Sequence, residues 1–437
     1  MSIANSVGTC TRKCGTILLD AITFMVFLFL DFLDTFFCVI FKLLDKFFEG
    51  KASPCYCKSK AELINGDNEE IRGLSETLYR RKNVFREMGF LNFAGKLEYR
   101  KQIDGFDGGR RFLNRWSDCG CESCVSWIKD NACQKLHVVV REFPQERSDD
   151  SRRESTENVI FVHGFASSSS LWTETVFKNL AGPIKGHDYR FFAVDLLGFG
   201  RSPKPSDCMY TLNDHVEMIG KSVISPFQLD SFHLVAHSMG CIVAVALAAK
   251  YSKFVKSVTL VAPPYFPSSK DGTISSSMVL KKLAGKRLWP PLAFGQSVMS
   301  WYEHIGRCFC FLFCRNHRTW ERILKLLTRK KELSFMIVDL TRHTHHSGWH
   351  SMHNVICGGA KFMDDYLGIL NRSKVEICII HGDRDPVVPL ECSNNMKMKF
   401  PNVELKIIQN ANHGTVILGR KKEFARTLEH IWASTHM

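Results

Sequence analysis

The 437-residue chain lacks several features that would assign it to a special class of protein. It has no internal repeat, which excludes a repeat architecture, and nothing in it resembles a nucleic-acid recognition module despite a net charge of +14. Long charge-free apolar runs are also missing, because the longest one near the N-terminus, Ala21–Leu30, has ten residues. A membrane-spanning helix needs about twenty. The composition, 45% hydrophobic and 23% charged, is that of a globular protein with ample material for a large core.

The most informative stretch lies around Ser238. Residues 232–240, FHLVAHSMG, lead from an apolar run into a turn, and strong helix formers follow over 241–250. A strand that turns sharply into a helix around a serine is a nucleophile elbow. The strained turn requires small residues two before and two after the serine; Gly240 meets this need, and Ala236 is the smallest departure from the commoner glycine. Taken alone, the motif could still be an ordinary strand–helix junction.

Three further segments favour the elbow. Residues 159–166, VIFVHGFA, form a strand that ends in His-Gly-aromatic, and the loop after such a strand supplies one N–H of an oxyanion hole. We expect that hole to consist of the backbone N–H groups of Phe165 and Met239. Later in the chain, strands are followed by loops that carry Asp385 and His413, and the order Ser, Asp, His is that of α/β-hydrolases.

The residue types fit acyl transfer. A serine hydroxyl becomes a good nucleophile when a base takes its proton, and a carboxylate fixes the tautomer of that base. We predict Ser238 as the nucleophile, His413 as the general base and Asp385 as the acid that orients it. Asp383 is the alternative acid, while Asp195 precedes the nucleophile in the chain and is expected only to fix the loop after its strand.

Over residues 135–435 these motifs resemble the α/β-hydrolase superfamily. More narrowly, the run HGFASSSSLWTET from His163, the AHSMG elbow, the hydrophobic N-terminus and the Cys-rich segment resemble the plant BODYGUARD family. That resemblance implies a lysophospholipase-like extracellular hydrolase that acts on an acyl ester in cuticle or cutin lipid metabolism. It also implies a lipid or acyl-ester substrate. A nucleic-acid partner is not expected, because no recognition module is present.

Apolar runs that alternate with helical patterns predict an α/β fold, with a mostly parallel central sheet and helices on both faces. We expect strands at 136–142, 158–163, 190–195, 231–236, 256–262, 375–381 and 403–409, and a last helix at 421–433. A long stretch between the fifth and sixth strands predicts a helical cap, with 14 basic and 5 acidic residues over 268–356. We expect a signal or anchor region at 1–54 and a polar, Cys-rich leader at 55–134. The hydrolase core is expected in two parts, at 135–267 and 357–437, with the basic helical cap between them at 268–356.

The N-terminus indicates entry into the secretory pathway. Arg12 and Lys13 precede an apolar run, as in a signal peptide, but no small-x-small cleavage site is evident. Charges interrupt the run, so an uncleaved anchor or an amphipathic helix on the membrane is an alternative. We expect a secreted or cell-wall protein, with a membrane tether through the N-terminal segment as an open alternative. We also expect the sequon at Asn371 to be glycosylated if that loop is accessible.

Seventeen cysteines are many for a cytosolic hydrolase. The densest group is Cys119, Cys121, Cys124 and Cys133, for which we expect disulfides rather than the alternatives of zinc or free thiols. Five histidines at 343–353 allow a metal site by spacing, yet cleft-lining or surface histidines are the favoured interpretation. We therefore predict no metal and no cofactor.

Two other functions remain open. An acyltransferase or cutin-polymerising transesterase could use the same three residues, although the His-x4-Asp arrangement of one lipid acyltransferase class is absent. A hormone-receptor-like binding protein could keep the fold and the triad without turnover, but the hydrophobic N-terminus argues against it. An epoxide hydrolase is disfavoured because its elbow nucleophile is an aspartate.

Overall fold

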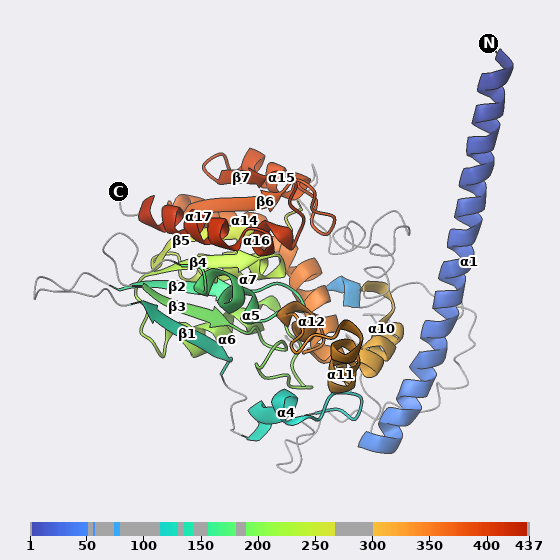
Figure 1. The fold of residues 1–437 in the computed structure, drawn as a ribbon, viewed down its shortest axis with the longest axis horizontal. Coiled ribbons are helices and arrows are strands. Elements are labelled where there is room, and N and C mark those ends of the chain that lie inside the picture. The colour runs from blue at the N-terminus through green and yellow to red at the C-terminus, as the bar shows by residue number, and fades with distance from the viewer. Residues whose placement is uncertain are drawn as a thin grey trace, which may run out of the picture.

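A seven-stranded sheet forms the centre of the molecule in a computed structural model that describes residues 2–50, 56, 74–78, 114–129, 135–143, 156–180, 189–266 and 300–434 (Figure 1). The strand order is β1-β3-β2-β4-β5-β6-β7; β1 runs antiparallel to β3, and every other pair is parallel. All seven predicted strands are confirmed to within two residues. They are β1 Val138–Phe143, β2 Glu157–Val162, β3 Tyr189–Val194, β4 Phe232–His237, β5 Val255–Val261, β6 Glu376–Gly382 and β7 Glu404–Ile408.

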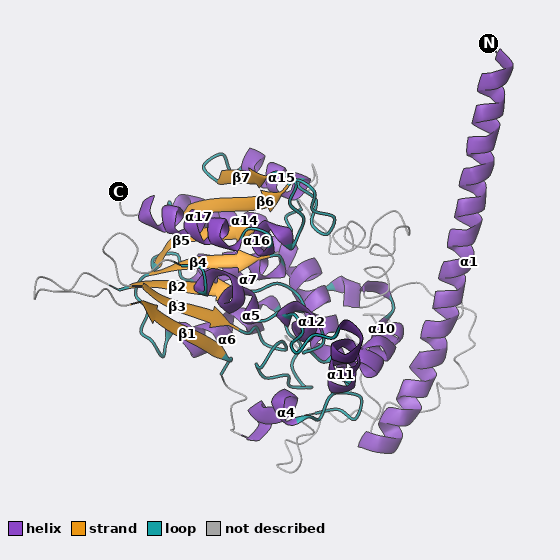
Figure 2. Cartoon of the chain, in the orientation of Figure 1, coloured by secondary structure: helices purple, strands orange, loops and turns teal. Residues whose placement is uncertain are grey.

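The sheet is covered on both faces, as predicted. Along β2 the side chains alternate: Ile160 and Val162 pack into the cluster that includes α7, whereas Val159 and Phe161 pack into the cluster that contains Trp432 of the last helix. This period of two, with every residue of β2 buried, is the pattern of a central strand between two helical layers. Figure 2 shows the strands as one layer between the helices.

The helices around the sheet come from the two halves of the chain on either side of the insertion. Their bounds are α5 Ser170–Trp172, η4 Thr173–Phe177, α6 Leu212–Ile219, η5 Gly220–Ile224, α7 Met239–Lys250, α14 Met363–Arg372, α15 Glu391–Lys399, α16 Thr415–Leu418 and α17 Lys421–Ser434. The last of these confirms the helix predicted at 421–433.

The predicted helical insertion between β5 and β6 is present from residue 300 onward, and residues 267–299 lie outside the described ranges. Its helices gather beyond the carboxyl ends of the strands (Figure 1). They are α10 Glu303–Phe309, η6 Cys310–Cys314, α11 His317–Thr328, α12 Phe335–Leu340, α13 His345–His350, η7 Ser351–Gly358 and η8 Gly359–Phe362.

Segments from the N-terminal part of the chain pack on this cap. Helix α1 is continuous over Ser2–Glu49, and its C-terminal part lies beside α10 (Figure 1). The short helices η2 Glu76–Leu78 and α4 Glu122–Lys129 belong to the predicted Cys-rich leader. Leu74 and Leu78 pack with Tyr56 and with Trp349 of α13, so described parts of the leader are joined to the cap.

Candidate active site

Ser238 lies in a strained turn between β4 and α7. Its backbone has φ 52° and ψ −124°, in the region that costs a residue other than glycine about 1–3 kcal/mol. The surroundings explain why the turn needs small neighbours: a Cβ on Gly240 would lie 2.4 Å from the carbonyl oxygen of His163, and one on Gly164 would lie 3.0 Å from Cβ of Ser238. The strand before the turn and the loop after β2 therefore approach each other closely around the serine.

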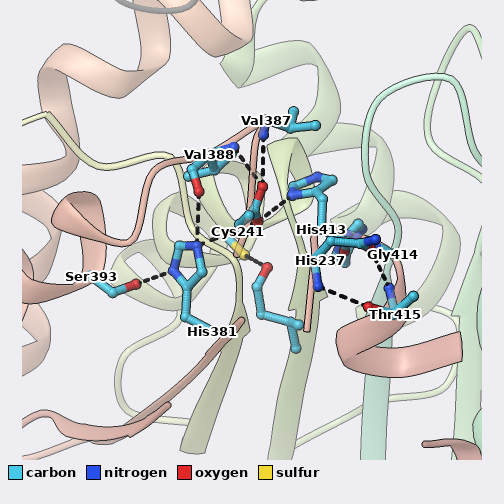
Figure 3. A network of polar contacts seen from close by, with 12 residues as sticks. His237, Cys241, His381, Val387, Val388, Ser393, His413, Gly414 and Thr415 are labelled. Atoms are coloured by element: carbon cyan, nitrogen blue, oxygen red, sulfur yellow. Dashed lines mark hydrogen bonds and ion pairs between the residues drawn. The ribbon is translucent and has the colours of Figure 1, made fainter. Parts of the chain in front are cut away.

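The structure brings Asp385 and His413 together in the loops after β6 and β7. Nδ1 of His413 donates to Oδ2 of Asp385 at 2.7 Å, and Oδ1 of the same carboxylate accepts the backbone N–H groups of Val387 and Val388 at 2.8 and 2.9 Å. Figure 3 shows His413 and the two valines converging on this point. Both carboxylate oxygens are occupied, so the acid is fixed in orientation.

Asp385 is ionised in this environment. Burial alone would raise the pKa of its carboxyl group, but hydrogen bonds from His381 and His413 and from the backbone lower that pKa well below its ordinary value. His381, at 3.4 Å from Oδ2, is itself held by the carbonyl oxygen of Val388 and the hydroxyl of Ser393. The sequence analysis did not single out His381, whose only signal was its place at the end of β6.

Asp383, the alternative acid, occupies a different environment. Its backbone N–H donates to the carbonyl oxygen of Ile408 at 3.1 Å, which extends the sheet by one bond. Oδ1 of Asp383 is buried without a hydrogen-bond partner among the described residues, and no contact with His413 is found there. The geometry thus favours Asp385 over Asp383 as the partner of the histidine.

His237 links the loop of His413 to the elbow. Its Nε2 donates to the backbone oxygen of His413 at 3.1 Å, and the two rings lie 4.7 Å apart between centroids. Burial lowers the pKa of His237 to about 3, so the ring is neutral and its one N–H is committed to this bond. His237 is a positioning residue that the sequence analysis missed, although it directly precedes Ser238.

The two expected oxyanion donors flank the serine. Met239 is the first residue of α7, and the first N–H groups of a helix have no partner within it. Phe165 is in the loop after β2, beside Gly164, and its ring packs on Phe199 at 5.6 Å. An anion over the elbow would therefore meet the positive end of a helix dipole.

Asp195 holds the neighbouring loops in place, as the sequence predicts. Oδ1 accepts the N–H of Ser169 at 2.6 Å, and Oδ2 accepts the N–H of Arg201 at 2.7 Å. Since Asp195 is almost fully buried, these bonds fix the serine-rich loop after β2 against the loop after β3.

Comparison with known proteins assigns the family. Residues 157–308 match the model of the α/β-hydrolase fold. The chain is 53% identical to "Probable lysophospholipase BODYGUARD 4" of Arabidopsis thaliana over 97% of this chain and 99% of that protein. The chain belongs to the BODYGUARD family. "Probable lysophospholipase BODYGUARD 5" of the same plant is 52% identical, with 97% of both chains covered. An esterase from Exiguobacterium antarcticum has an 18% identical sequence and a TM-score of 0.45, over 69% of this chain and 96% of that one.

This BODYGUARD family member ties its cap to the serine-rich loop through one buried carboxylate. Oγ of Ser168 donates to Oδ2 of Asp339 in α12 at 2.6 Å. Burial raises the pKa of Asp339 to about 6, and the nearby Asp195 acts in the same direction, while the Ser168 bond and Arg342 oppose it. The contact between the cap and the active-site loop thus includes a group that titrates near neutral pH.

Four of the five cap histidines, His345, His346, His350 and His353, are buried, so the surface alternative is wrong for them. The other alternative, that they line the substrate cleft, stays a prediction. His346, His350 and His353 lie on α13 and η7, where they pack against Tyr210, Tyr56 and Trp349. Burial lowers the pKa of each ring, which keeps all three neutral. Nε2 of His346 and Nδ1 of His353 already bond to a carbonyl oxygen and to the hydroxyl of Thr77. These histidines are core residues of the cap.

The expected disulfides are also not found among the cysteines that the structure describes. Cys119, Cys121 and Cys124 are all free thiols, and Cys133 lies outside the described ranges. Cys241, Cys378 and Cys392 are buried in the core around the sheet. These three cysteines at 119–124 therefore do not support the expectation that the protein is in an oxidising compartment.

Proposed function

We propose that this α/β-hydrolase cleaves an acyl ester of a lysophospholipid-like lipid through a Ser238 acyl-enzyme, and that it does so in cuticle lipid metabolism. The observation that carries the proposal is the 2.7 Å bond between Asp385 and His413, beside a strained serine at an elbow. The family names support the lipid substrate, and the resemblance to proteins of cuticle formation supports the process.

The reaction follows from these residues. Oγ of Ser238 attacks the acyl carbon while Nε2 of His413 takes its proton, because Nδ1 keeps its hydrogen on Asp385. The N–H groups of Phe165 and Met239 stabilise the oxyanion of the tetrahedral intermediate. The imidazolium then returns the proton to the leaving alcohol, and a water activated by the same histidine releases the fatty acid.

A substrate panel tests the proposal. The purified enzyme is incubated with lysophospholipids, acylglycerols and cutin monomers, and the lipid products are measured by mass spectrometry. We expect free fatty acid from lysophospholipids with the wild type and background levels with Ser238→Ala. Esters in place of free acid would identify a transferase, and no conversion of any lipid would contradict the proposal.

We further propose that helix α1 stays in the mature protein and lies on a membrane surface. Among the described residues, Phe24–Glu49 is long and apolar enough to cross a membrane. The acidic residues that interrupt this run, however, face the protein: Asp31, Asp34 and Asp45 are buried, whereas Lys46 is exposed. The exposed face is instead rich in large apolar residues, namely Ile22, Phe24, Met25, Phe29, Phe32, Phe36, Leu43, Phe47 and Phe48. In a water-soluble helix the apolar residues are buried and the charged ones exposed, and here the aspartates are buried and the apolar residues exposed. This arrangement suits a helix with protein on one side and lipid on the other.

Two buried contacts join α1 to the cap. Oδ1 of Asp34 accepts the N–H of His304 at 2.9 Å, at the start of α10. Asp45 binds the guanidinium of Arg307 with both oxygens, at 2.5 and 2.8 Å, and both side chains are nearly inaccessible to solvent. Removing one partner of a buried pair costs about 3–5 kcal/mol, so loss of α1 would leave the cap with an unpaired charge.

We therefore expect the protein isolated from plant cells to retain residues 30–49. Mass spectrometry of its N-terminal peptides checks this, and a mature N-terminus after Glu49 would contradict it.

In sedimentation with phospholipid vesicles, the double variant Phe32→Ser/Phe36→Ser should bind less than the wild type. Phe254→Ser is the matched control, because Phe254 is exposed on the core and is not part of α1.

A further inference from the structure

Three cysteines of the leader meet a histidine of the cap. Cys119 and Cys121 precede α4, Cys124 lies in its first turn, and His317 is the first residue of α11, nearly two hundred positions later. Nε2 of His317 lies 3.4 Å from Sγ of Cys121 and 3.4 Å from Sγ of Cys124. The three sulfur atoms and the ring nitrogen all lie within 4.8 Å of one another.

These separations suit a tetrahedral zinc ion. With Zn–S bonds of about 2.3 Å and a Zn–N bond of about 2.0 Å, sulfur and nitrogen ligands stand roughly 3.5 Å apart. A disulfide would require two sulfurs at about 2.0 Å and would leave the third thiol unpaired. Three cysteines and one histidine form one of the common ligand sets of structural zinc sites.

The groups behind the ligands are arranged as in a metal site. Nδ1 of His317 donates to Oε1 of Glu321 at 3.0 Å, one turn later on α11. A carboxylate on the far nitrogen fixes the tautomer that leaves the lone pair of Nε2 directed at the metal. The backbone N–H of Cys121 points to Sγ of Cys119 at 3.4 Å, which would stabilise a thiolate there. Both hydrogen bonds would hold a ligand atom, Nε2 of His317 or Sγ of Cys119, in position for the metal.

The charge of the surroundings also fits. Zinc with three thiolates and a neutral imidazole carries a net charge of −1. Arg115, Arg315 and Arg318 line the hollow beside Cys119 and Cys121 together with one acidic residue, Asp118, so positive charge predominates there. Thiolate ligands favour zinc over magnesium or calcium, which prefer oxygen.

We propose that Cys119, Cys121, Cys124 and His317 form a structural zinc site that joins the leader segment 114–129 to helix α11 of the cap. Four protein ligands leave no open position for a substrate, so the metal holds the structure together and takes no part in ester cleavage. The sequence analysis considered zinc only with Cys133 as the fourth ligand. His317 could not be recognised as a ligand from the sequence, because it lies nearly two hundred positions after the cysteines and forms no local motif with them.

Metal analysis of the full-length protein, purified without chelators, tests the site. We expect Cys124→Ser and His317→Ala each to contain one zinc fewer per chain than the wild type, while Cys308→Ser keeps the wild-type content. Cys308 is a suitable control because it lies on α10 in the same cap and is not one of the four proposed ligands. X-ray absorption at the zinc edge of the wild type should include a site with three sulfur ligands near ~2.3 Å and one nitrogen near ~2.0 Å.

A second measurement covers variants that fail to fold. In the native wild type, maleimide labelling read by peptide mass spectrometry should spare Cys119, Cys121 and Cys124 until a chelator is added, and chelation should lower the melting temperature. A wild type without zinc, equal zinc in the wild type and both ligand variants, or a disulfide between any two of these cysteines would overturn the proposal. None of these readouts depends on catalysis.

Discussion

Replacement of Ser238 by alanine is expected to abolish labelling by a fluorophosphonate probe and to reduce kcat roughly 10⁶-fold, the loss found when a triad serine is removed. The hydroxyl is the only group at the elbow turn proposed to bond covalently to the acyl carbon. The probe reacts with activated serines, so gel fluorescence of wild type and variant gives the answer directly.

Two checks make this result specific. Ser225→Ala removes an exposed serine at the end of η5 and should leave labelling unchanged. Thermal unfolding of Ser238→Ala should remain cooperative, because the strained backbone is held by Gly164 and Gly240 whichever side chain is present. Equal labelling of wild type and Ser238→Ala would remove Ser238 from the mechanism and favour a binding role for the fold.

Replacement of Asp385 by asparagine is expected to lower kcat by about 10⁴-fold. The backbone N–H groups of Val387 and Val388 both donate to one oxygen of this side chain, so an amide would place its oxygen there and its NH₂ toward His413. Nδ1 would then have to accept a hydrogen bond, and the hydrogen of the ring would move to Nε2. A histidine in that tautomer cannot take the proton of Ser238.

Asp383→Asn is the matched control for this experiment, because it makes the same chemical change two residues away. Its effect on kcat should be small, since no bond joins Asp383 to His413 among the described residues. Steady-state kinetics on one lysophospholipid compares the two variants. A larger loss in Asp383→Asn than in Asp385→Asn would transfer the role of the acid.

The sheet and the candidate site were predictable because their signals are local. Each strand is a short apolar run between polar turns, and Ser238, Asp385 and His413 each follow a strand that predicts where the side chain lies. The predictions that were wrong concern residues whose partners lie far away in the sequence. Asp34 and Asp45 count against a membrane helix in the sequence, yet α10 provides a partner for each. Asp34 accepts the backbone N–H of His304, and Asp45 pairs with Arg307. The burial of the cap histidines was missed because the leader residues that contact them, Tyr56 and Thr77, lie more than 270 positions away in the sequence.

Fewer features of the chain than expected point to an oxidising compartment. The N-terminal apolar run, the cysteine group and the sequon were expected to require the same compartment, but the cysteines at 119–124 are free. What remains is α1 and Asn371, which is exposed in the last turn of α14 and accessible to glycosylation.

Burial of Asp339 where the cap meets the serine-rich loop links the stability of the folded protein to pH. The carboxyl group has a pKa of about 6 in the folded protein, above its ordinary value of 3.8, so the folded state binds this proton more tightly than the unfolded state does. This contribution to stability is fully present below about pH 4 and is lost between about pH 4 and 6, as Asp339 ionises while buried. The bond from Ser168 opposes the shift, because it favours the ionised carboxylate, and it therefore offsets part of this loss at neutral pH.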